Sequence, residues 1–99
     1  MNINWKLLKI SEFDFDFLIK EALFERVPHL RRVKILPKQR FSEDLNVNSV
    51  DLIVIWTKIE HKLLSYDINL SKYHEDNRLM DVKTLEDLHE FVYTRALLV

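Results

Sequence analysis

The chain from residue 49 to residue 64 reads Ser49-Val50-Asp51-Leu52-Ile53-Val54-Ile55-Trp56-Thr57-Lys58-Ile59-Glu60-His61-Lys62-Leu63-Leu64. This stretch contains neither proline nor glycine, and its apolar residues recur at helical spacing. One predicted face consists of residues three or four positions apart, followed by a leucine near the end: Val50, Ile53, Trp56 or Thr57, and Leu63 or Leu64. Further apolar residues widen the arc well beyond that of an ordinary surface helix: Val54, Ile55 and Ile59. The stretch therefore predicts a long helix that anchors an all-α fold.

Signals for the start of this helix lie at its first residues. Asn48 or Ser49 supplies an N-cap side chain, and Asp51 falls in the first turn, where the helix dipole favours an acid. A similar signal, Thr84-Leu85-Glu86-Asp87, predicts a last helix that continues to the C-terminus. Residues 65–81 are mixed and polar, with room for one short additional helix.

A first helix is predicted after Ser11, which precedes an acid three residues later and is followed by no proline until Pro28. Its apolar face combines residues at helical spacing: Phe15, Leu18, Ile19, Ala22 and Leu23. The alternation Phe13-Asp14-Phe15-Asp16-Phe17 also fits a strand, but the capping signal favours a helix that runs to Arg26.

Composition excludes many classes of protein. The 99 residues include no cysteine, which excludes disulfides, thiolate zinc sites and cysteine nucleophiles. They also include no glycine, so the dinucleotide fingerprint, the P-loop and the nucleophile elbow are absent. With 47% apolar residues and a net charge of −1, the chain is expected to form a single helical domain over residues 1–99, with residues 1–10 as an N-terminal extension.

The charge is distributed unevenly, because residues 26–40 carry six basic residues and no acid. These residues are Arg26, Arg31, Arg32, Lys34, Lys38 and Arg40. Apolar residues and two prolines interrupt the segment, and it lacks an aromatic residue for base stacking. The pattern favours a solvated loop over a nucleic-acid interface, so no nucleic-acid partner is expected.

Catalytic and metal-binding patterns are also missing. The four histidines form no i, i+4 pair within a plausible helix, so no metal site is expected. The serines lie in predicted caps and loops without a glycine-built oxyanion hole, which argues against an enzyme. No segment approaches the roughly 18 consecutive apolar residues of a membrane span, and no signal peptide is recognisable, so no membrane partner and a cytoplasmic location are expected.

One stretch carries a specific pattern: Phe41-Ser42-Glu43-Asp44-Leu45-Asn46-Val47-Asn48-Ser49-Val50-Asp51. It delivers a serine to the start of the long helix, where free backbone N–H groups stabilise an attached phosphate. A plain N-cap serine is the alternative explanation. The stretch resembles the phosphopantetheine attachment region of acyl carrier proteins, and Leu63, Ile68 and Thr84-Leu85 continue the resemblance in helix order.

The resemblance implies an acyl-carrier-protein-like four-helix bundle with a long first loop. Ser49 would carry 4′-phosphopantetheine, transferred from coenzyme A by a separate phosphopantetheinyl transferase with Mg²⁺. The arm would hold an acyl or aminoacyl group as a thioester and present it to acyl-transferring or acyl-modifying enzymes of fatty-acid or secondary-metabolite biosynthesis. The chain itself would be a monomer and not an enzyme. Its residues for partner recognition would be those around the serine: Asn48, Val50, Asp51, Leu52 and Val54.

The sequence also departs from the family pattern. Family members usually have glycine at the position of Asn46 and aspartate at that of Asn48, and the latter change keeps open an unmodified, carrier-like interaction module. Leu52, Val54 and Lys58 replace residues that are often polar or acidic. Apolar residues on the outer side of this helix predict either a surface for a partner or for self-association, or a rotated helix in which they belong to the core. The expected core or sheltered groove comprises Phe41, Leu45, Ile53, Ile59, Leu63, Leu85, Leu88 and Val92.

Overall fold

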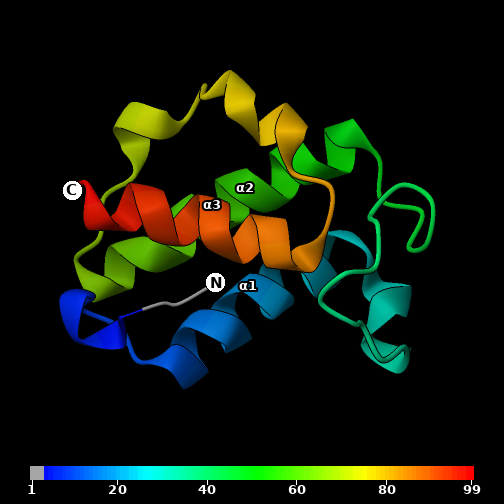
Figure 1. Cartoon of the computed structure of the whole chain (residues 1–99), viewed down its shortest axis with the longest axis horizontal. Helices are drawn as coiled ribbons and strands as arrows, with labels where there is room; N and C mark the ends of the chain where they lie inside the picture. The colour runs from blue at the N-terminus through cyan, green and yellow to red at the C-terminus, as the bar shows by residue number, and fades with distance from the viewer. Residues whose placement is uncertain (1–3) are drawn as a thin grey trace.

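Three α-helices build the computed structural model, which describes residues 4–99 (Figure 1). They are α1 (Glu12–Arg26), α2 (Ser49–Leu63) and α3 (Leu85–Leu97). Short 3-10 helices occupy the connections: η1 (Trp5–Leu7), η2 (Pro28–Arg32), η3 (Leu64–Tyr66), η4 (Ser71–Tyr73) and η5 (Asn77–Asp81). The described chain has no strand, so the all-α prediction is confirmed, whereas the predicted fourth helix is represented only by 3-10 turns.

The predicted helix starts agree with the observed caps. Ser11 caps α1, because its hydroxyl accepts a hydrogen bond from the N–H of Asp14 at 3.1 Å. Thr84 caps α3 in a reciprocal capping box with Asp87. These side chains satisfy backbone donors that a helix end leaves without partners. The strand alternative for residues 13–17 is therefore not realised.

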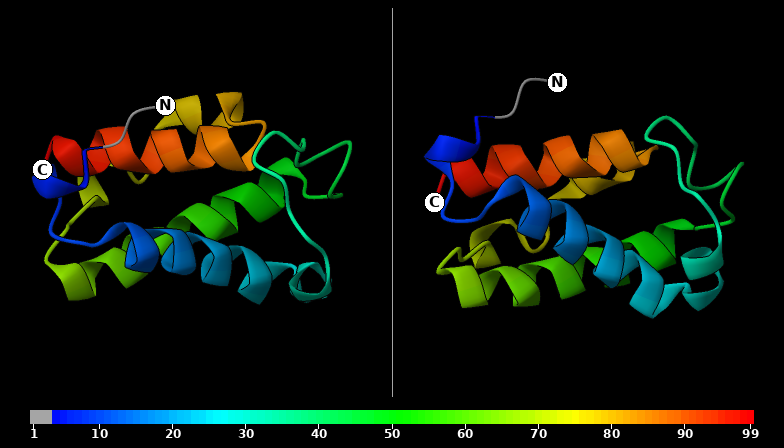
Figure 2. Two further views of the ribbon diagram at one scale, coloured as in Figure 1. Left: turned by 60° about the horizontal axis from the view of Figure 1, so that its bottom comes forward. Right: turned by 90° about the horizontal axis from the view of Figure 1, so that it is seen from below.

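The connection between α1 and α2 is fastened to the start of α3, at the end of the molecule away from the C-terminus (Figure 2). Phe41 donates its N–H to the carbonyl of Lys83 at 2.8 Å, and Glu86 donates to the carbonyl of Pro37 at 3.0 Å. An isolated antiparallel bridge pairs Arg40 with Thr84. These contacts give the long loop a defined path to the start of α2.

The core runs between all three helices, and seven of the eight predicted core residues are buried. The exception is Ile53, which is 48% exposed and was wrongly assigned to the core. The buried stripe of α2 instead comprises Leu52, Ile55, Trp56, Ile59 and Leu63. The apolar arc of this helix is so wide that its pattern alone does not fix the rotation, which the packing against α1 and α3 decides.

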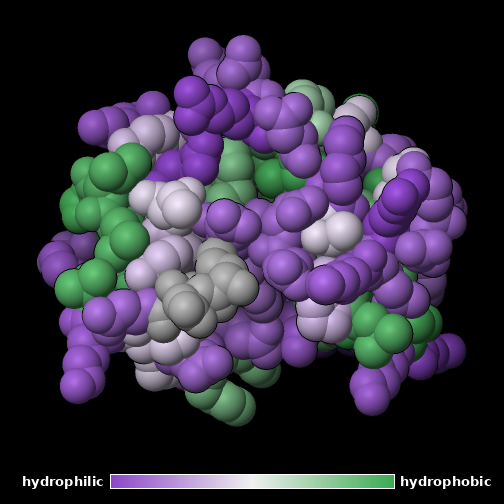
Figure 3. Space-filling model, viewed as in Figure 1, coloured by the Kyte–Doolittle hydropathy of each residue, from purple (hydrophilic) through white to green (hydrophobic). Residues whose placement is uncertain are grey.

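Residues 4–10 of the predicted extension pack onto the bundle, while residues 1–3 lie outside the described part. Asn4 donates its N–H to the Tyr93 hydroxyl at 3.0 Å, and Trp5 meets Phe15 edge to face at 4.9 Å. Apolar side chains gather at the surface near the C-terminus (Figure 3), where Leu98 and Val99 are exposed. Within residues 4–99, no helix combines the length and hydrophobicity needed to cross a membrane.

Candidate functional site

Asn48, and not Ser49, caps α2. The Asn48 side-chain oxygen accepts a hydrogen bond from the N–H of Asp51 at 2.8 Å, and Asp51 accepts in return from the N–H of Asn48 at 3.1 Å. The carbonyl of Asn48 accepts from the N–H of Leu52. Ser49 is therefore the first residue inside the helix, and its exposed hydroxyl takes no part in the cap.

The loop that delivers Ser49 is held by buried apolar side chains. Phe41, Leu45 and Val47 are all buried, and the N–H of Val47 donates to the carbonyl of Phe41 at 2.7 Å. Between them Asn46 has a φ of 55°, in the left-handed region that glycine adopts freely and that asparagine tolerates better than most residues. Asn46 therefore makes this turn without a glycine.

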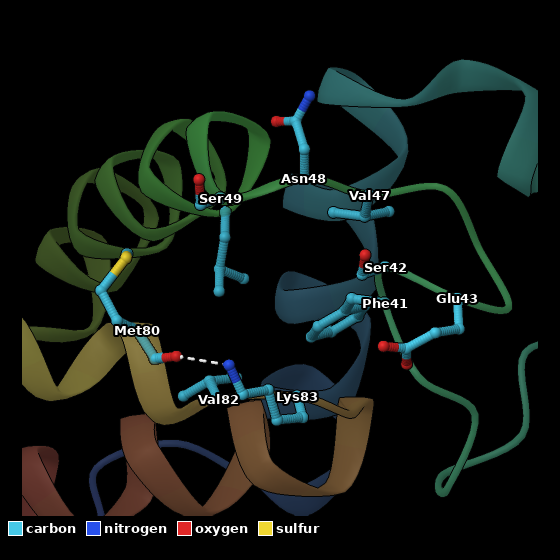
Figure 4. Close-up of a pocket in the computed structure, with 10 residues that line it drawn as sticks. Phe41, Ser42, Glu43, Val47, Asn48, Ser49, Met80, Val82 and Lys83 are labelled. Atoms are coloured by element: carbon cyan, nitrogen blue, oxygen red, sulfur yellow. Dashed lines mark hydrogen bonds between the residues drawn. The ribbon is translucent and has the colours of Figure 1, made fainter.

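A hollow of about 450 Å³ lies beside Ser49 (Figure 4). The Ser49 side chain and the polar residues of the preceding loop are at its rim, and Leu52 and Val82 supply apolar surface. Met80 and Lys83 bound it on the side of η5, where the Lys83 ammonium donates to the carbonyl of Met80 at 2.9 Å. The lining residues are Phe41, Ser42, Glu43, Val47, Asn48, Ser49, Leu52, Met80, Val82 and Lys83.

Asp51 is engaged within the molecule. The N–H of Asn48 lowers the pKa of the Asp51 carboxyl, and Arg26, whose Nε donates to it at 2.8 Å, lowers this pKa further. The ion pair joins the last turn of α1 to the first turn of α2. The acid predicted to recognise partners is thus ionised and already has a cation beside it.

The remaining predicted recognition residues divide between surface and core. Val50 is 59% exposed, Asn48 is exposed and Val54 is half-buried, whereas Leu52 is 5% exposed. Of the two alternatives for the apolar residues of this helix, the core assignment is correct for Leu52, because its side chain is buried in the hydrophobic core, although it also lines the hollow. Ile53 and Met80 are exposed apolar residues in this region that the recognition set lacked.

The basic segment is partly neutralised by acids of the same chain. Arg31 makes a bidentate contact with Glu21 at 2.9 and 3.3 Å and lies over the ring of Phe24, while Arg26 pairs with Asp51. On α2, Lys58 pairs with Glu25 of α1 at 3.6 Å, and Lys62 pairs with the same carboxylate at 2.8 Å. Within residues 26–40, the pairs of Arg26 and Arg31 favour a structural role for these two arginines.

Two histidines have displaced pKa values for opposite reasons. Glu60 accepts a hydrogen bond from His74 at 2.7 Å and raises the pKa of that imidazole. Burial lowers the pKa of His89, which lies 3.4 Å from Asp16. Among the described residues, no group of three or more His, Cys, Asp or Glu side chains is arranged to hold a metal ion.

Comparison with family models, curated proteins and solved structures finds no match to this chain.

Proposed function

We propose that this chain is a carrier protein whose Ser49 hydroxyl accepts 4′-phosphopantetheine. The single observation that carries the proposal is that Asn48 makes the capping hydrogen bond, so Ser49 is exposed in the first turn with its hydroxyl outside the cap. A serine used only as a cap would direct its oxygen at the backbone N–H two or three residues later.

The surroundings of Ser49 fit the chemistry of the group. The cap and the first helical bond engage the N–H groups of Asp51 and Leu52, while those of Ser49 and Val50 have no partner within residues 4–99. Free N–H groups at a helix N-terminus favour a phosphodiester on the adjacent side chain. The hollow of about 450 Å³ offers the arm and its cargo a sheltered surface.

In the proposed reaction, the Ser49 oxygen attacks the phosphorus that bears the pantetheine arm of coenzyme A. A phosphodiester to serine forms, the bond to adenosine 3′,5′-bisphosphate breaks, and the serine proton passes to a base of the transferase, which supplies Mg²⁺. The bound arm then supplies a thiol that carries an acyl or aminoacyl group as a thioester. The chain, which has no cysteine, contributes position and shelter and is not the enzyme.

The surface around Ser49 would meet the transferase and the acyl-handling enzymes. Val50, Ile53 and Met80 present exposed apolar side chains there, with Asn48 and Val54 beside them. The two acids of α2 are paired, Asp51 with Arg26 and Glu60 with His74. We therefore expect docking that is less dependent on salt than that of a carrier with an acidic helix.

The test is the intact mass of the protein before and after incubation with coenzyme A, Mg²⁺ and a broad-specificity phosphopantetheinyl transferase. We expect a gain of one phosphopantetheine in the wild type and none in Ser49→Ala. Ser42→Ala is the matched control, because Ser42 is also exposed and lines the same hollow. The same gain in Ser49→Ala, or loss of it in Ser42→Ala alone, contradicts the assignment of Ser49.

An unmodified interaction module is the second candidate. Asn48 at the family's aspartate position and the apolar residues Val50 and Ile53 on the outer side of α2 favour it. No mass gain with several transferases, from a sample that unfolds cooperatively, would support this candidate. A sedimentation experiment on the same sample tests the expectation of a monomer.

A further inference from the structure

Residues 32–38, which we call the cationic loop, belong to the connection between α1 and α2 and lie at the end of the molecule away from the C-terminus (Figure 2). The cations of the loop are Arg32, Lys34 and Lys38, and all three are exposed. None of them forms an ion pair with another described residue, whereas the two earlier arginines of the basic segment are paired with acids. The positive charge of this loop is therefore available to a partner outside the chain.

The cationic loop also exposes aliphatic side chains between its cations. Val33 is 46% exposed and Leu36 is 49% exposed. Ile35, by contrast, packs against the core, and together with Pro37 it lines a pocket between the loop, α1 and α3. Figure 3 shows apolar surface between hydrophilic side chains at this end of the molecule. The loop is thus held to the bundle on one side and presents cations and aliphatic groups together to solvent.

Hydrogen bonds give the cationic loop a defined shape. The N–H of Leu36 donates to the side-chain oxygen of Gln39 at 2.7 Å, and the N–H of Gln39 donates to the carbonyl of Leu36 at 3.1 Å. The carbonyl of Pro37 accepts from the N–H of Glu86 on α3 at 3.0 Å. A partner would therefore meet an ordered turn, which reduces the entropy that binding must overcome.

Acids near the cationic loop offset its charge only in part. Asp16 and Glu86 line the pocket between the loop and the helices. Asp16 is paired with Lys20 at 3.1 Å, which leaves Glu86 as the one acid lining this pocket that makes no ion pair within the described chain. Three free cations therefore exceed one free carboxylate, and the outer side of the loop favours an anionic partner.

The combination of residues selects the kind of anionic partner. A bilayer that contains anionic lipids offers negative headgroups and an apolar layer a few ångströms below them, so it suits cations and aliphatic groups on one turn. Protein interfaces are depleted in lysine and typically use about 20–30 residues from each partner, far more than this loop provides. A nucleic acid would hold Val33 and Leu36 against phosphates, and the loop has no aromatic residue to stack on bases.

We propose that the cationic loop docks this chain on an anionic membrane surface, with its three cations at the headgroups and Val33 and Leu36 in the interfacial layer. A surface contact of this kind requires no membrane-spanning helix, the lack of which was the reason for expecting no membrane partner. The docking itself does not depend on modification of Ser49. Because α2 also begins at this end of the molecule (Figure 2), docking would turn the end that bears Ser49 toward the lipid.

The test is co-sedimentation of the unmodified protein with phosphatidylcholine vesicles, with and without about one-third phosphatidylserine, in 0.1 M NaCl. We expect binding to the anionic vesicles that weakens as the salt concentration rises. Each cation at such a surface contributes about a fivefold gain, so the triple variant Arg32→Gln/Lys34→Gln/Lys38→Gln should bind about a hundredfold more weakly. The matched control, Lys6→Gln/Lys72→Gln/Arg78→Gln, removes the same charge from exposed residues elsewhere and should stay within about threefold of the wild type.

A second pair of variants tests the aliphatic side chains. Val33→Ser/Leu36→Ser keeps every charge and should weaken binding at least about tenfold, because these side chains no longer leave water for the interfacial layer. Val50→Ser/Ile53→Ser, which alters exposed residues of α2, should bind like the wild type. Circular dichroism verifies that each variant is folded, as expected for substitutions of exposed side chains.

Several results would overturn the inference. Among them are no binding to anionic vesicles, equal binding to neutral and anionic vesicles, and equal losses in the loop variants and their controls. Tighter binding to a DNA duplex of about 20 base pairs than to the vesicles would assign the cations to nucleic acid and would also overturn it. Since the protein carries no phosphopantetheine in these assays, none of these results bears on the proposed modification of Ser49, which intact mass tests separately.

Discussion

The capping role of Asn48 can be tested by replacing it with alanine. This change removes the oxygen that accepts the 2.8 Å hydrogen bond from the N–H of Asp51 and leaves that N–H without its partner in the protein. Loss of an asparagine cap typically costs about 1 kcal/mol of the free energy of unfolding. In a domain of 60–100 residues, a loss of that size lowers the melting temperature by about 4–8 °C.

The assay is thermal unfolding followed by circular dichroism or calorimetry, with two comparison variants. Asn48→Ser keeps a capping oxygen and should stay within about 0.5 kcal/mol of the wild type. Ser49→Ala should also stay within about 0.5 kcal/mol, because the Ser49 hydroxyl makes no capping bond and is exposed.

The opposite ranking would refute this reasoning. If Asn48→Ala unfolds like the wild type and Ser49→Ala loses about 1 kcal/mol, then serine is the cap. The proposal that its hydroxyl is free for modification would lose the observation that carries it. Because both variants alter the same helix end, their comparison is independent of the rest of the fold.

Three more predictions concern the histidines and the rotation of α2. Because the pKa of His74 is raised in the folded protein, its pairing with Glu60 stabilises the fold below the ordinary histidine pKa. This stabilisation is lost as the pH rises through the pKa of the folded state. Melting curves of the wild type and His74→Gln, recorded from pH 5 to 9, should therefore converge at high pH. Because the pKa of His89 is lowered in the folded protein, the wild type should lose stability as the pH falls below the ordinary histidine pKa. His89→Gln should remove this loss. Urea unfolding curves whose pH dependence below neutrality is the same in the wild type and the variant would contradict this. Ile55→Ala should cost about 2–5 kcal/mol and Ile53→Ala less than about 1 kcal/mol, since Ile55 is fully buried and Ile53 is 48% exposed; equal costs in denaturant unfolding would contradict the observed rotation.

Local signals were sufficient for the helices. Ser11 and Thr84 cap α1 and α3 as predicted, because a capping bond involves residues only three apart and needs no tertiary contact. Phe41 and Leu45 were also correctly assigned to the core. The short additional helix was harder to predict, since the connection between α2 and α3 has no periodic pattern and forms separate 3-10 turns that end at η5.

The site was predicted in part. The serine and its cap region could be found because they are contiguous in sequence, although Asn48 and Ser49 were equally acceptable as the cap. Met80 and Val82 were not expected beside Ser49, because they reach the hollow from a distant connection and no local pattern links them to it. The assignment of Ile53 to the core failed for a different reason, since α2 is apolar over most of its circumference.

The sequence by itself determined the three long helical segments, the caps of α1 and α3, and which serine stands at the start of the longest apolar stretch. These properties depend on residues within one or two turns of one another. The tertiary structure decided which side of α2 is buried, since the packing of α1, η5 and α3 against it distinguishes among its many apolar residues. It also decided that Asp51 is paired with Arg26 and that Leu52 and Met80 line one hollow. Those contacts join residues from separate elements, whose meeting depends on how the helices pack.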